Sequence, residues 1–126
     1  MHHMHKQFFI SGNVPSSKNS KRWTGKTLIW SALATKYVKN TKEQWESMSE
    51  EFSSLFNNKT KPVKVYFKFI RDSRRRFDYV NPLQTVLDLM VKYNWIEDDN
   101  ADIIIPVFIE YEYNKINPGV IIELWD

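Results

Sequence analysis

Residues 77–99 read FDYVNPLQTVLDLMVKYNWIEDD, and this stretch predicts one helix with carboxylates before it, within it and after it. Asn81 followed by Pro82 predicts the start, because Asn is a preferred N-cap and Pro is tolerated at the first helical position. Gln84 then stands where its amide could complete a capping box. The apolar residues recur at helical spacing and predict a buried face made of Leu83, Val86, Leu87, Met90 and Val91.

The carboxylates around this helix need a physical explanation. Asp78 precedes it, Asp88 lies on its polar face, and Glu97, Asp98 and Asp99 follow it. A helix C-terminus carries partial negative charge, so carboxylates there interact unfavourably with the helix dipole unless another group compensates. A hard cation would relieve the repulsion, since Mg²⁺ binds one or two carboxylates and keeps several waters. The alternative is a solvated acidic turn that opens the next strand.

Basic residues form two clusters that could hold phosphate groups. The first lies in a Gly/Ser/Asn/Pro-rich loop over residues 12–26, and the second lies directly before Asp78. A loop rich in Ser, Lys and Asn can donate hydrogen bonds and positive charge to a phosphate backbone, although it can also be an ordinary exposed loop. The candidate DNA-binding residues are Lys18, Asn19, Lys21, Arg22, Arg74, Arg75 and Arg76.

Length, charge and cysteine content limit the class of protein. The chain has 126 residues, a formal charge of +3 and no Cys, which predicts one domain (1–126) in a reducing cytoplasm. No apolar run approaches the roughly 20 residues of a membrane span, so we expect no membrane partner. The His-rich residues 1–5 predict a disordered N-terminus or a tag remnant rather than a metal site.

The order of predicted elements defines the fold class. Strands are expected at residues 6–11, 27–30, 62–70, 102–113 and 120–125, with a long helix between the second and third. Pro106 favours an edge position for its strand. Ser31 is the expected cap of the long helix, and a break is expected near Asn40-Thr41. Its expected buried face contains Leu33, Tyr37, Trp45, Met48, Phe52 and Leu55. The fold class is α+β: a mixed β-sheet of about four strands with two main helices packed on it, in the order β-(β)-α-β-α-β-β.

These motifs together resemble the RusA family of Holliday junction resolvases, endodeoxyribonucleases of phages and prophages. The resemblance covers most of the chain. It rests on Pro15 with Asn19, on the strand that leads into the arginine run, and on carboxylates at matching spacing. Those family positions are Asp78, Asn81, Asp88, Asp98 and Asp99. The resemblance implies a homodimer in the bacterial cytoplasm that resolves four-way junctions and other branched DNA in recombination and repair.

The resemblance also implies Mg²⁺, with Mn²⁺ as an alternative, held by carboxylates beside a basic surface. It assigns catalysis to Asp78, Asp99 and Asp88, and metal binding to Asp78, Asp99 and Asp98. Two positions depart from the family motif, since Val80 replaces an Asp and Gln84 replaces a Lys. A valine cannot ligate a metal, so the remaining carboxylates must hold it.

Two other functions fit the same residues. The first is a DNA-binding protein of the same fold in which Val80 has abolished cleavage; it would bind junctions with a steep salt dependence. The second is a phage interaction protein whose acidic turn and basic run pair across a dimer and which binds no nucleic acid.

Overall fold

The computed structural model describes residues 5–16, 21–23 and 28–125. It confirms the α+β fold class, with a four-stranded mixed sheet and two long helices. The sheet strands are β1 (His5–Ser11), β4 (Val63–Arg71), β5 (Ile104–Tyr113) and β6 (Gly119–Trp125), and the helices are α1 (Ala32–Asn57) and α2 (Val80–Lys92). The strand predicted at residues 27–30 is β3 (Leu28–Trp30). It pairs with β2 (Lys21–Trp23), a strand inside the segment that we expected to be loop throughout.

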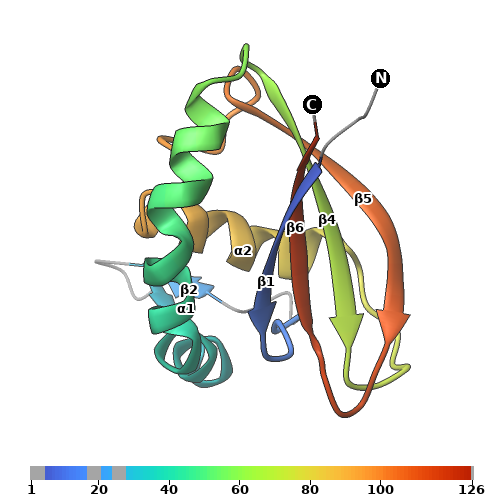
Figure 1. The fold of residues 1–126 in the computed structure, drawn as a ribbon. Helices are drawn as coiled ribbons and strands as arrows, with labels where there is room; N and C mark the ends of the chain where they lie inside the picture. Colours follow the sequence, from blue (N-terminus) through green and yellow to red (C-terminus); the bar gives the residue numbers. More distant parts are fainter. Residues whose placement is uncertain (1–4, 17–20, 24–27, 126) are drawn as a thin grey trace.

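The strand order in the sheet is β1-β6-β4-β5. Strands β1 and β4 are both antiparallel to β6, whereas β4 and β5 are parallel, and α2 forms the crossover between them. Strand β5 therefore lies at the edge, as Pro106 predicted. Both helices pack on the same face of the sheet, as Figure 1 shows. The alternation predicted for β4 is confirmed, because Val63, Val65, Phe67 and Phe69 are buried in this layer.

Helix α1 begins where the sequence predicted. The Ser31 hydroxyl accepts a hydrogen bond from the Ala34 N–H at 3.1 Å and so caps the helix. The expected break near Asn40-Thr41 is wrong. The buried Thr41 hydroxyl donates to the Tyr37 carbonyl at 2.8 Å and accepts from the Trp45 indole N–H at 3.0 Å, and the helix continues through it.

Two residues expected on the buried face of α1 are exposed. Leu33 is 61% exposed and Leu55 is 37% exposed. The buried stripe instead follows Ala34, Tyr37, Thr41, Trp45, Phe52 and Phe56. The polar Thr41 lies in the middle of this stripe. A prediction based on hydrophobic residues alone therefore placed the centre of the buried face of α1 at the wrong position.

Helix α2 starts earlier than the capping motif predicted. Its N-cap is Tyr79, which makes no side-chain capping bond, so the expected cap at Asn81 is wrong. Gln84 does not reach back toward the helix start, because its amide donates to Asp88 Oδ1 at 3.0 Å. The buried stripe is confirmed: Leu83, Val86, Leu87 and Met90 are buried, and Val91 is half-buried against the core.

Aromatic rings join the helices to the sheet. Trp95, directly after α2, is fully buried against Phe52 of α1, with ring centroids 4.7 Å apart. Its indole N–H donates to the Trp45 carbonyl at 2.8 Å. Phe8 of β1 meets both Phe52 and Trp95 edge-on. The segment that carries the acidic run is therefore fixed to the core at its first residues.

Among the helices of the described segments, none has the length and apolar character needed to cross a membrane. The prediction of disorder for residues 1–5 concerns positions that, except for His5 in β1, lie outside the described residues.

Candidate functional site

The acidic run lies in a turn built by the end of α2. Asn94 adopts a left-handed conformation (φ 64°), which Asn tolerates better than most residues. The N–H groups of Trp95 and Ile96 both donate to the Met90 carbonyl, at 2.8 and 3.3 Å. These bonds reverse the chain and bury Trp95 and Ile96 while the following carboxylates remain at the surface. Glu97, the first of them, pairs with Lys61.

Asp98 organises the turn itself. Its carboxylate accepts hydrogen bonds from the Asp99 N–H at 2.8 Å and from the Asn100 side-chain amide at 2.9 Å. The Asn100 bond, followed by the Asp99 backbone bond, lowers the pKa of Asp98, which is fully exposed. Asp98 therefore stays ionised and holds the backbone that carries Asp99.

Asp99 and Asp88 are brought near one another by this turn. Burial raises the pKa of Asp99, and the neighbouring carboxylates of Asp98 and Asp88 raise it further. Asp88 projects from α2, where the Gln84 amide donates to Oδ1, and its Oδ2 atom is buried. Two half-buried carboxylates from different elements therefore lie close enough to repel each other, and a cation between them would relieve that repulsion.

Asp78 lies in the turn before α2, between two aromatic residues. Phe77 and Tyr79 meet edge-on with centroids 5.3 Å apart, and Phe77 also meets Tyr111 at 5.0 Å. The register of β4 and β5 shifts after Lys68, which is a β-bulge, and the Tyr79 hydroxyl accepts from the Tyr111 N–H there at 3.0 Å. These contacts fix the chain on both sides of Asp78, whose own side chain is exposed.

The carboxylates do not gather into one large cluster. Within the described residues, no three His, Asp or Glu side chains form a group that could hold a metal ion. At most two carboxylates could then contribute to one cation site among these residues, and Mg²⁺ is an ion that binds one or two carboxylates and keeps several waters. The metal assignments to Asp78, Asp98 and Asp99 stay predictions.

The arginine run comprises the arginines of residues 71–76, and it contains one buried arginine and three exposed ones. Arg71 is 6% exposed and donates to the Val14 carbonyl at 2.6 Å and to the Ser16 hydroxyl at 2.8 Å. Arg74, Arg75 and Arg76 are exposed, and the Arg74 guanidinium lies over the Tyr113 ring, 4.5 Å from its centroid. The three surface arginines are available for phosphates, whereas Arg71 positions the loop that follows β1.

The N-terminal basic residues can be placed only in part. Lys18 and Asn19 lie outside the described residues, and Lys21 and Arg22 lie in β2, where only the backbone is described. The segment leading to them is anchored near the arginine run by Arg71 and by the Asp72 N–H, which donates to Asn13 Oδ1 at 3.0 Å. The two basic segments of the sequence therefore start from adjacent positions in the fold.

Sequence reasoning missed a third basic surface. A groove of about 470 Å³ between α1 and the end of α2 is lined by Thr35, Val38, Lys39, Lys42, Lys92 and Tyr93. The spacing of Lys36, Lys39 and Lys42 signals a basic helix side, but Lys92 joins them only because α2 packs against α1.

Comparison with protein-family models found no match, and a search of curated proteins found none either. The functional argument therefore rests on this chain's own residues.

Proposed function

We propose that this protein is a magnesium-dependent endodeoxyribonuclease that cuts four-way junctions and related branched DNA. The proposal is carried by two half-buried carboxylates, Asp88 on α2 with its Oδ2 atom buried and Asp99 in the turn that Asp98 holds, which lie within electrostatic reach of each other. Carboxylates arranged in this way favour binding of a hard cation. A bound Mg²⁺ would lower the pKa of an attacking water and neutralise charge on the scissile phosphate.

The protein's own residues have separate tasks in this proposal. Asp88 and Asp99 hold the cation, Asp98 keeps Asp99 in position, and Asp78 orients the attacking water. Arg74, Arg75 and Arg76 hold the phosphate backbone without reading bases, as would Lys18, Asn19, Lys21 and Arg22. Such a site recognises DNA shape rather than sequence.

A homodimer belongs to the same proposal, because resolving a junction requires paired nicks and a two-fold axis supplies paired sites. Support comes from the sheet face opposite the helices, which alternation assigns to Phe9, Ile121, Tyr66 and Trp125. Phe9 and Trp125 are 39% and 47% exposed. Glu123 on this face accepts hydrogen bonds from the Gln7 amide at 2.9 Å and from the Trp125 indole at 2.7 Å. These bonds hold the Gln7 and Trp125 side chains in place on the face.

The test is cleavage of a synthetic four-way junction with Mg²⁺ by the wild type and by the Asp78→Asn, Asp88→Asn and Asp99→Asn variants. Asp102→Asn is the matched control, because Asp102 is exposed just beyond the same turn. We expect Asp88→Asn and Asp99→Asn to lose at least about 100-fold in rate, the scale on which lost electrostatic stabilisation acts. Equal rates in all five proteins would discard the proposal.

A second function has a specific observation in its favour. Val80 stands in the first turn of α2 where the family motif carries an acid, and its side chain is 64% exposed. A protein of this kind would bind junctions without cutting them. Junction binding that weakens steeply with salt, together with no nicking at any Mg²⁺ concentration, would establish this function instead. Failure to bind any DNA at low salt would favour the phage interaction protein.

A further inference from the structure

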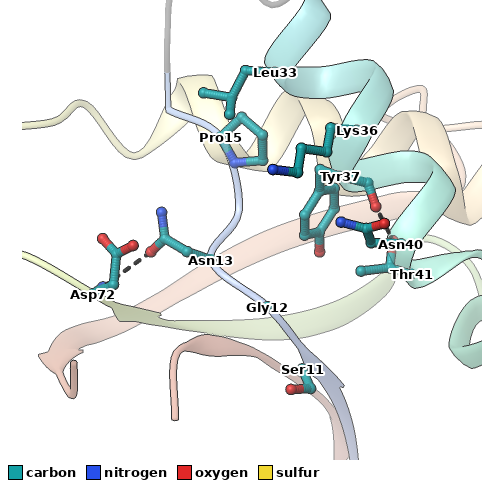
Figure 2. Close-up of a pocket in the computed structure, with 10 residues that line it drawn as sticks. All are labelled: Ser11, Gly12, Asn13, Pro15, Leu33, Lys36, Tyr37, Asn40, Thr41 and Asp72. Atoms are coloured by element: carbon teal, nitrogen blue, oxygen red, sulfur yellow. Dashed lines mark hydrogen bonds between the residues drawn. The ribbon is translucent and has the colours of Figure 1, made fainter. Parts of the chain in front are cut away.

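A pocket of about 270 Å³ lies away from the acidic turn, between the segment after β1 and the first turns of α1. Figure 2 shows the chain from Ser11 to Pro15 on one side and the side chains of Leu33, Lys36, Tyr37 and Asn40 on the other. Pockets for drug-sized ligands start at roughly 300 Å³, so this one suits a single small ring system.

The hydroxyl of Tyr37 is the unusual group in this pocket. Tyr37 is 6% exposed, and its hydroxyl has no hydrogen-bond partner among the described residues. Burial raises the pKa of this phenol well above its usual value, so it remains a protonated donor. Figure 2 shows the hydroxyl directed from α1 toward the segment around Gly12 and Asn13. A buried donor without an acceptor is costly, and a ligand acceptor would remove the cost.

The other walls match a planar heterocycle. Pro15, which is buried, and Leu33, which is 61% exposed, supply apolar surface in the lining. Asn13 accepts from the Asp72 N–H through Oδ1, which leaves its amide N–H groups to donate. Asn40 brings a second amide, with one donor side and one acceptor side. Side-chain amides of this kind pair with the edges of nucleobases.

We propose that this pocket receives one unpaired nucleobase of a DNA strand. The base lies against Pro15 and Leu33, an acceptor on its edge takes the Tyr37 hydroxyl, and Lys36 pairs with the adjoining phosphate. The segment that carries Asn13 and Pro15 is tied through Asp72 and Arg71 to the arginine run, so the pocket continues the DNA surface already described. This inference rests on the proposed function and adds a strand-recognition site to it.

Fluorescence of 2-aminopurine tests the proposal. A short single-stranded oligonucleotide with one 2-aminopurine is titrated with the wild type, Tyr37→Phe, Asn40→Ala and Asn57→Ala. The last is the matched control, because it removes an exposed side-chain amide at the other end of α1, far along the helix from Asn40. We expect the wild type and the control to bind alike, and Tyr37→Phe and Asn40→Ala to bind roughly fivefold more weakly, as loss of one hydrogen bond requires.

Two further arms separate the possible outcomes. Urea denaturation should show Tyr37→Phe at least as stable as the wild type, because an unpartnered hydroxyl is removed. Competition with a free deoxynucleoside monophosphate should need far higher concentrations than competition with unlabelled oligonucleotide. Equal competition would overturn the assignment to a DNA strand. Unchanged affinity of Tyr37→Phe would overturn the pocket while leaving junction cleavage intact, whereas absence of all DNA binding would overturn both.

Discussion

Arg71 at the end of β4 donates a 2.6 Å hydrogen bond to the carbonyl of Val14, 57 residues earlier in the chain. The same guanidinium reaches the Ser16 hydroxyl and lies over the Phe77 ring, 4.6 Å from its centroid. One buried cation therefore joins the loop after β1, the end of β4 and the residue before Asp78. The first basic segment, the arginine run and the aromatic support of Asp78 all depend on it.

Replacing Arg71 by Met should destabilise the protein by about 1–3 kcal/mol, because the buried Val14 carbonyl would lose its donor. Urea denaturation measures this loss. Arg75→Met is the control and should change stability by less than about 0.5 kcal/mol, as is usual for exposed positions. Similar stabilities for the two variants would show that the Arg71 contacts contribute little to folding.

The two adjacent carboxylates of the acidic turn should respond oppositely to pH. Burial, then Asp98 and Asp88, raise the pKa of Asp99 above 3.8, so the folded state holds this proton more tightly than the unfolded chain. Its contribution to stability is therefore lost as pH rises through the folded pKa. Asp99→Asn should be more stable than the wild type at about pH 7, and this advantage should disappear in acid below 3.8.

Asp98 supplies the internal control for that prediction. Hydrogen bonds from Asn100 and from the Asp99 backbone lower its pKa, so its contribution is present above 3.8 and is lost as pH falls. Asp98→Asn should be less stable than the wild type at neutral pH. The measurement is the urea midpoint of unfolding of Asp98→Asn, Asp99→Asn and the wild type as a function of pH. A lower stability of Asp99→Asn than of the wild type at neutral pH would contradict the environment described for the Asp99 carboxylate.

Local signals predicted much of the fold, and contacts distant in sequence explain the errors. The Ser31 cap, the β4 alternation and the α2 stripe depend on neighbours within a few residues, and all three are confirmed. The Asn81 cap failed because Tyr79 is held by Tyr111, 32 residues away, so the helix starts two residues earlier than the Asn-Pro signal predicted. The predicted break at Thr41 failed because the Trp45 indole satisfies its hydroxyl.

The candidate site was predictable as residue types but not as an arrangement. Acids on both sides of α2 indicated a cation site, and the structure brings Asp88 near Asp99 because Trp95 folds the chain back onto the core. The sequence could not separate Arg71, a buried anchor, from the three exposed arginines that follow it. The sequence also gave no sign of the pocket at Tyr37, because a tyrosine at helical spacing from other apolar residues predicts only a buried core residue.

The exposed arginines should set the salt dependence of DNA binding. Each phosphate contact contributes about 0.9 to the slope of log affinity against log salt on duplex arms. Arg75→Ala combined with Arg76→Ala should therefore lower the slope by about 2 and weaken binding equally for all sequences. Lys64→Ala is the control, because Lys64 is exposed near the start of β4, at the opposite end of that strand from the arginine run. An unchanged slope in the double variant would place the DNA elsewhere, with the Lys39, Lys42 and Lys92 groove as the next surface to test.

An acid placed at the start of α2 offers a gain-of-function test of the proposed cation site. Val80 is the first residue of α2 and is 64% exposed, so an aspartate there would be hydrated and would meet the favourable positive end of the helix dipole. Val80→Asp should keep or slightly increase stability and should lower the Mg²⁺ concentration for half-maximal cleavage roughly tenfold, equivalent to about 1.4 kcal/mol of cation binding. Val80→Asn, which adds polarity without charge, should leave that concentration unchanged. If both variants behaved alike, the start of α2 would lie too far from the Asp88 and Asp99 carboxylates to share a cation with them. Asp78, which directly precedes α2, would then have no role beside that cation.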